Sequence, residues 1–149
     1  MSTVKILVVS QKGGVGKSTL SANLTAWLGD QFNNNTALLD FDPHGSSSSW
    51  VKSARSSGVF VKHYVPSEFG ERRWLLSSRS LIRSYRDNFK YLICDLTWSP
   101  AMDAEFIHEF DLVIVPTSVS SIELAGTKKF IESISWVFQL NNRTAPTLL

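Results

Sequence analysis

Nine residues near the N-terminus carry the groups needed to hold a chain of phosphates. They read, in order, Gln11, Lys12, Gly13, Gly14, Val15, Gly16, Lys17, Ser18 and Thr19. Glycines let the backbone turn tightly and approach an anion, so that consecutive N–H groups point at its oxygen atoms. A lysine ammonium adds a full positive charge at the outer phosphates, and a serine hydroxyl can ligate Mg²⁺. Residues 13–19 therefore predict a phosphate cradle, with Lys17 as its cation and Ser18 as a metal ligand.

The flanking sequence supplies the elements that such a cradle requires. An apolar run at residues 4–9 predicts a buried strand, and residues 18–32 predict a helix. The apolar positions of that helix that we expect to be buried are Leu20, Leu24, Trp27 and Leu28. A helix N-terminus that follows a glycine turn adds its own amide groups and dipole to the binding of an anion. This context favours nucleotide binding over a glycine turn without function.

Aspartates follow two further apolar segments. Asp40 and Asp42 lie two residues apart in the segment 36–43, and Asp95 ends the segment 90–95. Alternation along a strand places Asp40 and Asp42 on the same side. Because ligands bind at the carboxyl ends of parallel strands, we expect these two carboxylates to face the phosphate cradle. Asp95 has the form of a Walker B residue, which would hold Mg²⁺ through a bound water.

The front of the glycine segment departs from the common phosphate-loop pattern. G-x-x-x-x-G-K-[ST] would need glycine at position 11, where this chain has Gln11, and a second lysine, Lys12, follows it. The sequence K-G-G-V-G-K-S-T resembles the deviant Walker A motif of the ParA/MinD family of ATPases, which position chromosomes, plasmids and other cell cargo. The segments D-F-D-P and D-L-V-I-V-P are similar to further parts of that family. The resemblance extends over the whole chain.

The resemblance implies roles for individual residues. Lys12 would reach across an ATP-sandwich dimer to the nucleotide of the partner. Asp42 would orient or activate the attacking water, and Asp40 would have an auxiliary role at Mg²⁺ or in the switch. His44 stands where the family usually has glutamine, and Trp98 stands in the second switch. The chain therefore departs from the family at both switches.

The resemblance also implies what the whole protein does. It predicts a Mg²⁺-dependent ATPase that binds ATP and ADP, forms a homodimer on ATP, and turns over slowly until a ParB-like partner or cargo adaptor stimulates it. Non-specific DNA would be its working surface, in the bacterial cytoplasm at the nucleoid. Family members continue for several tens of residues past the last strand expected here. We therefore expect residues 1–149 to form a single P-loop ATPase domain that lacks its C-terminal part.

Three alternatives remain open. A MinD-like membrane-associated ATPase would need a terminal amphipathic helix, which these residues do not show. A tyrosine kinase of related fold would carry a tyrosine-rich tail, whereas Tyr64, Tyr85 and Tyr91 lie within expected elements. A nucleotide-binding module without hydrolysis would fit the changes at His44 and Trp98. Iron–sulfur carriers are excluded, because the chain has a single cysteine.

Strands and helices alternate to the end of the chain. Near-continuous apolar strands separated by helices predict a doubly wound, mostly parallel α/β sheet with helices on both faces, as in P-loop NTPases. A length of 149 residues with 43% hydrophobic content suits one globular domain with a sizeable core. The last helix, at residues 120–140, is expected to bury Ile131, Ile134 and Phe138.

The helix expected at residues 68–89 carries a basic stripe opposite its apolar face. The stripe consists of Arg72, Arg79, Arg83 and Arg86. Such a stripe is typical of the solvated side of an amphipathic helix. Guanidinium groups along one face would also suit contacts to the phosphate backbone of non-specific DNA. Basic and acidic residues nearly balance, so the net charge of +2 does not by itself favour nucleic-acid binding.

Overall fold

The computed structural model describes residues 2–11, 15–33, 35–54, 58–65, 71–139 and 145–149. The strands are β1 (Val4–Ser10), β2 (Thr36–Asp40), β3 (Phe60–His63), β4 (Tyr91–Thr97), β5 (Leu112–Ile114) and β6 (Thr147–Leu148). The helices are α1 (Lys17–Gln31), α2 (Ser46–Ser53), α3 (Glu71–Tyr85) and α4 (Ser121–Ile134), with 3₁₀ turns η1 (Ala104–Glu109) and η2 (Ser135–Phe138). All strand pairings are parallel, in the order β3-β2-β4-β1-β5-β6. The predicted doubly wound parallel fold is confirmed.

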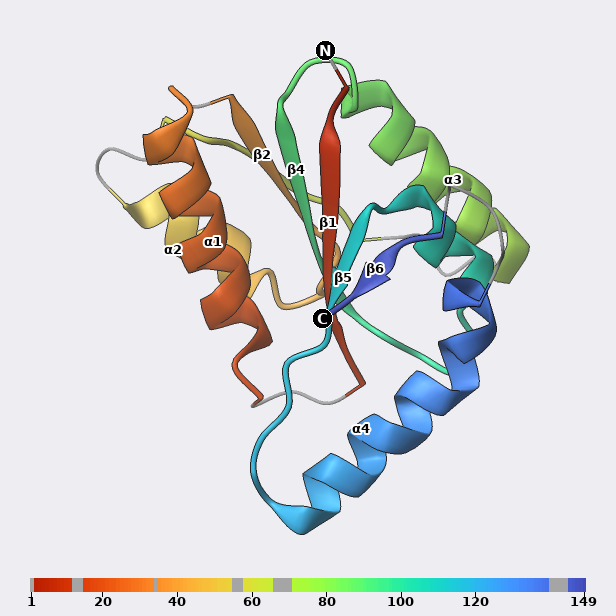
Figure 1. Cartoon of the computed structure of the whole chain (residues 1–149). Coiled ribbons are helices and arrows are strands. Elements are labelled where there is room, and N and C mark those ends of the chain that lie inside the picture. The colour runs from red at the N-terminus through yellow and green to blue at the C-terminus, as the bar shows by residue number, and fades with distance from the viewer. Residues whose placement is uncertain (1, 12–14, 34, 55–57, 66–70, 140–144) are drawn as a thin grey trace.

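Two hydrophobic layers lie on opposite faces of the sheet. Alternation along β1 directs Ile6 and Val8 to one face and Leu7 and Val9 to the other. Helices α1 and α2 cover the first face, and α3, η1 and α4 cover the second (Figure 1). Both faces of the central strands are thus buried, which explains their continuous apolar sequence. No helix formed by the described residues is long and apolar enough to cross a membrane.

The buried face of α1 differs from the prediction at one position. Trp27 is 58% exposed, while Leu28 is buried and Leu20 and Leu24 are partly buried against the core. The inward face is formed mainly by small residues: Ser21, Ala22, Thr25 and Gly29. Small side chains allow a helix to lie close to a sheet, so the wide apolar stripe that the sequence suggested is not needed. The prediction for Trp27 was wrong.

The inward face of the last helix also shifts. Phe130, Ile134 and Val137 are buried, whereas Ile131 and Phe138 are only partly buried. The α-helix ends at Ile134 and continues as the 3₁₀ turn η2. Because a 3₁₀ turn has three residues rather than 3.6, the position after Ile134 that faces inward is 137 rather than 138.

Strand order brings the polar strand ends together. β4 lies between β2 and β1, with Asp40 opposite Asp95 and Ser10 opposite Thr97. The loops that follow β1, β2 and β4 therefore leave the sheet at the same edge, as expected for parallel strands.

Candidate functional site

The described part of the glycine segment ends in a backbone turn that requires glycine. Gly16 has φ +87°, and a Cβ there would meet nothing within 4 Å, so conformation rather than space requires glycine. α1 begins at the next residue without a side-chain cap from its N-cap position. Its first-turn amide groups are therefore oriented as in an anion site. Lys12, Gly13 and Gly14 lie outside the described residues.

An open cavity of about 280 Å³ lies at this helix end. Its lining residues come from three loops of the same sheet edge: Gly16, Lys17, Ser18, Thr19, Asp42, His44, Ser46 and Thr97. The cavity thus joins the predicted phosphate-binding and metal-binding residues Lys17 and Ser18 with the predicted catalytic residue Asp42. Cation, hydroxyl groups and carboxylate converge on one space.

The Lys17 ammonium lies between two carboxylates. Its Nζ is 3.5 Å from Oδ2 of Asp42 and forms a closer ion pair with Oδ1 of Asp95. Lys17 is 5% exposed and Asp95 is fully buried. A cation is therefore already held between two acidic groups, of which Asp42 lines the cavity.

The Asp95 carboxylate is fully buried beside Lys17 and has one oxygen without a partner among the described residues. Burial raises the pKa of its carboxyl group, and the nearby Lys17 and Ser47 offset this rise only in part. Its second oxygen, Oδ2, and the Ser47 hydroxyl are buried without a hydrogen bond of good geometry among the described residues. Those residues also contain no cluster of three or more acidic, cysteine or histidine ligands. The unpartnered Oδ2 fits Mg²⁺, which binds through one or two carboxylates together with waters and phosphate oxygens.

Asp42 is held in its ionised form. Partial burial would raise the pKa of its carboxyl group, but this is outweighed by the N–H group of His44, the Thr97 hydroxyl and Lys17, so the pKa is lowered. Oδ1 accepts from the His44 amide at 2.9 Å, and Oδ2 accepts from Oγ1 of Thr97 at 2.8 Å. Sequence reasoning missed Thr97. Its position two residues after Asp95 on the same strand was the available signal, because alternation places both side chains on one side.

The Asp40 carboxylate accepts hydrogen bonds from two backbone amides. Its fully buried carboxylate accepts from the Asp42 amide at 3.0 Å and from the Ser48 amide at 2.9 Å. These bonds fix the turn after β2 and the first turn of α2. Asp40 is not among the residues that line the cavity. The two bonds give Asp40 a structural role at this turn, and its auxiliary role at Mg²⁺ or in the switch stays a prediction.

Trp98, which departs from the family at the second switch, belongs to the core. It is 6% exposed, and its ring lies 6.0 Å from that of Phe130. Its amide donates to the Ser10 carbonyl at 2.8 Å, which extends the contact between β1 and β4. The indole therefore stabilises the strand edge rather than lining the cavity.

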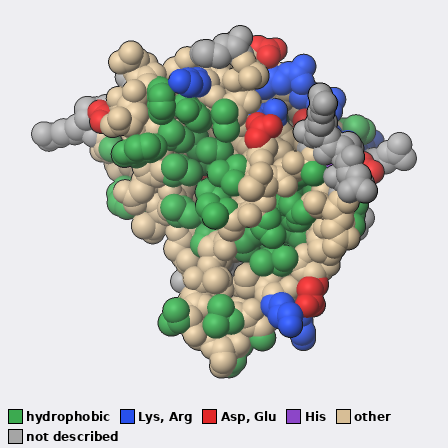
Figure 2. Space-filling view, viewed as in Figure 1, with side chains coloured by type: hydrophobic (Ala, Val, Ile, Leu, Met, Phe, Trp, Pro, Cys, Tyr) green, Lys and Arg blue, Asp and Glu red, His purple; other side chains and the backbone are tan. Residues whose placement is uncertain are grey.

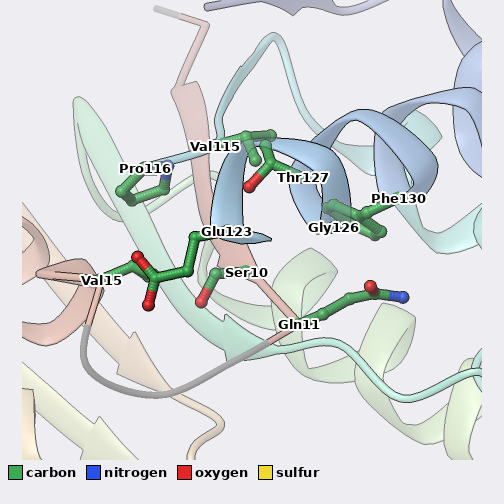
Figure 3. A pocket seen from close by; sticks show the side chains of 9 residues that line it. All are labelled: Ser10, Gln11, Val15, Val115, Pro116, Glu123, Gly126, Thr127 and Phe130. Atoms are coloured by element: carbon green, nitrogen blue, oxygen red, sulfur yellow. The ribbon is translucent and has the colours of Figure 1, made fainter. Parts of the chain in front are cut away.

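A second, smaller cavity lies beside the phosphate loop, between β1 and α4. Figure 3 shows Glu123 of α4 extending toward Val15 and Ser10, with Phe130 lining the other side of the cavity. The N-terminal part of α4 thus borders the loop from the side of β5.

The structure gives two of the stripe arginines partners on η1. Arg79 lies 3.1 Å from Glu109 and 3.6 Å from Glu105, and Arg83 binds Glu109 through two nitrogens, at 2.8 and 3.3 Å. Arg86 has only a 3.8 Å contact with its neighbour Asp87. The side chain of Arg72 lies outside the described part of the structure. Part of the stripe therefore ties α3 to η1.

The sequence profile of the CobQ/CobB/MinD/ParA nucleotide-binding domain matches residues 6–147. The chain belongs to this family. The carboxysome distribution protein A of Halothiobacillus neapolitanus is 24% identical over 144 residues, which cover 97% of this chain and 64% of that protein. The corresponding protein of Gloeobacter kilaueensis is 29% identical over 80% of this chain and 51% of its own length. The chain thus spans between half and two thirds of these curated relatives.

Solved structures of family members share the fold. Cobyrinic acid a,c-diamide synthase of Mycobacterium smegmatis, solved with an ATP analogue and magnesium, superposes with a TM-score of 0.73 at 22% identity, covering 98% of this chain and 72% of that one. A plasmid partition protein of Borrelia burgdorferi gives 0.70 at 18% identity, covering 97% and 82%. The P-loop α/β architecture of the ParA/MinD ATPases is therefore established for this chain.

Proposed function

We propose that this chain is the nucleotide-binding and hydrolysing part of a ParA-like positioning ATPase. The observation that carries the proposal is the position of the Lys17 ammonium between Asp42 and Asp95, beside the uncapped first turn of α1. ATP with Mg²⁺ is the ligand that matches these groups: phosphates suit the helix end and Lys17, while a divalent cation suits the carboxylates and Ser18. A carboxysome-positioning relative supports the assignment to positioning.

The residues divide the work of hydrolysis as follows. Lys17 would leave the carboxylates and bind the outer phosphates, and Asp95 and Ser18 would hold Mg²⁺. When bound, Mg²⁺ withdraws negative charge from the phosphate oxygens. Lys12, by resemblance, would act on the nucleotide of the partner in an ATP-bound homodimer.

The lowered pKa of Asp42 favours water orientation over proton abstraction. A general base works best when its pKa lies near the operating pH, and a carboxylate with a lowered pKa is a weak proton acceptor. Asp42 can still accept a hydrogen bond from water and aim it at the γ-phosphate. Slow basal turnover, which the family resemblance implies, would leave room for stimulation by a partner such as a ParB-like protein or a cargo adaptor.

Asparagine at Asp42 tests hydrolysis directly. Asp42→Asn keeps the size of the side chain but removes the charge that orients water, so we expect phosphate release to fall by about a hundredfold or more. The affinity for ATP with Mg²⁺ should stay within a few-fold of wild type. Asp30→Asn, an exposed aspartate on α1, is the matched control and should hydrolyse normally. Equal phosphate release from wild type and Asp42→Asn would identify a nucleotide-binding module without hydrolysis.

The working surface is tested by retention on non-specific duplex DNA. We expect retention with ATP that is lost with ADP and weakens as salt rises. Arg86→Glu should reduce it several-fold, because Arg86 is the described stripe arginine whose charge is least neutralised. Arg79→Glu with Arg83→Glu should instead lower the melting temperature by about 3 °C, because four carboxylates would then meet at α3 and η1.

Two results would redirect this proposal. Unchanged DNA retention in Arg86→Glu would remove α3 from the interface. No retention by wild type, with ATP binding confirmed, would turn attention to lipid vesicles. The exposed apolar side chains Val119, just before α4, and Ile122, in its first turn, would suit a membrane. Figure 2 shows apolar groups at this projecting end of the molecule, with basic and acidic groups beside them.

A further inference from the structure

The backbone of Asp42 is held by a histidine of the neighbouring strand β3. His63 is the last residue of β3, at the edge of the sheet. Its Nε2 lies 2.7 Å from the carbonyl oxygen of Asp42. Because a carbonyl oxygen can only accept, Nε2 carries the proton and donates. The sequence predicts a surface histidine there, since it has no cysteine, histidine or acidic partner at metal-ligand spacing.

The same carbonyl closes the turn after β2. It also accepts from the Gly45 amide at 3.0 Å, so both of its lone pairs are used. Gly45 lies in the left-handed region with φ +62°, and a Cβ there would be 2.9 Å from Cε1 of the His63 ring. The imidazole therefore packs directly on the turn that it hydrogen-bonds.

The two ends of Asp42 are fixed by different elements. Its carboxylate is held by Thr97 of β4 and Lys17 of α1, and its carbonyl is held by His63 of β3. Nucleotide binding would draw Lys17 toward the phosphates and so remove one of the carboxylate contacts. The contact with His63 does not depend on the phosphates, because His63 does not line the cavity.

We propose that His63 is a positioning residue for Asp42, which it holds in place through the Asp42 carbonyl while Lys17 moves to the nucleotide. The inference rests on the proposed function, in which Asp42 orients the attacking water. It assigns to the edge strand β3 a part in hydrolysis that involves no contact with ATP. A displaced carboxylate slows the chemical step, since geometric errors of about 1 Å are costly in catalysis. Binding of ATP through Lys17 and α1 is left intact.

Two substitutions of His63 separate positioning from packing. His63→Leu removes the donor and keeps an apolar side chain of moderate size, and we expect kcat to fall about tenfold with KM for ATP within about twofold. A tenfold loss corresponds to about 1.4 kcal/mol, the size of one net hydrogen bond. His63→Gln places a side-chain N–H near the position of Nε2 and should restore kcat to within about threefold of wild type. Equal losses in both variants, or unchanged kcat in His63→Leu, would overturn the proposal.

Amide hydrogen exchange tests the contact without requiring hydrolysis. In His63→Leu we expect the Gly45 amide, which donates to the Asp42 carbonyl, to exchange about tenfold faster than in wild type. Amides at the centre of β4 should be unchanged, which serves as the internal control for folding. Unchanged protection of Gly45 would refute the positioning role. If Gly45 exchanges faster in His63→Leu but the wild-type protein releases no phosphate, the contact with Asp42 is supported and the proposed hydrolysis is wrong.

Discussion

Alanine in place of Lys17 is expected to lower the affinity for ATP with Mg²⁺ by about a hundredfold. The substitution removes a charged hydrogen-bond donor to the phosphates, worth up to about 3 kcal/mol. It also leaves Asp42 and Asp95 facing the nucleotide without the cation that now lies between them. Titration calorimetry with a non-hydrolysable ATP analogue measures the change. Lys52→Ala, which removes an exposed lysine from α2, should bind like wild type.

Folding must be checked in the same variant. Lys17 is the cation beside the fully buried Asp95, so its loss leaves a carboxylate without its ion pair. Circular dichroism and a thermal melt will establish whether Lys17→Ala is folded at the temperature of the titration. Affinity within about threefold of wild type in a folded Lys17→Ala protein would exclude the start of α1 as the phosphate site.

The second large effect is expected in the core, at Phe106. Phe106→Ala should lower the free energy of unfolding by about 3–5 kcal/mol, a large part of the total for a domain of this size. Phe106 is fully buried on η1, with its ring 4.8 Å from Trp74 of α3, 5.3 Å from Phe110 and 6.0 Å from Phe41. Its removal would leave a cavity among three aromatic rings. Urea denaturation followed by fluorescence measures the loss.

Two further variants frame that experiment. Phe106→Leu keeps most of the volume and should cost much less, which gives a measurable value if the alanine variant does not fold. Leu76→Ala removes a 58% exposed side chain from α3 and should change stability by no more than about 0.5 kcal/mol. Similar losses from Phe106→Ala and Leu76→Ala would show that the aromatic cluster does not carry the stability of this face of the sheet.

The burial of Phe106 also connects the core to the site. Phe41 lies between Asp40 and Asp42, and its ring contacts both Phe106 and Tyr64. The aromatic cluster therefore supports the loop that holds the candidate catalytic aspartate. Phe41 therefore belongs both to the aromatic cluster beneath α3 and to the segment that carries Asp42.

The local sequence could predict the phosphate cradle and its surroundings because both depend on short-range order. A glycine turn between an apolar strand and a helix predicts the cradle from nine consecutive residues. The continuous apolar strands predict a parallel sheet. The same reasoning placed Asp42 just after a strand, because strand boundaries are partly a local property. It also ended a later strand at Asp95, which was wrong, because β4 continues to Thr97. It could not tell Asp40 from Asp42, since both have the same residue type and face the same side of one strand.

Only the tertiary structure decided how these groups are partnered. Strand order places β4 between β2 and β1, and this brings Thr97 to Asp42 across 55 residues of sequence. The edge position of β3 brings His63 to the Asp42 carbonyl, and the packing of η1 on α3 pairs the stripe arginines with glutamates. No periodic pattern in the sequence predicts these contacts, because each joins elements that are far apart in the chain and become neighbours only in the folded structure. The sequence by itself determined the chemistry of the site and the class of the fold, whereas the order of the strands determined which side chains hold that chemistry in place.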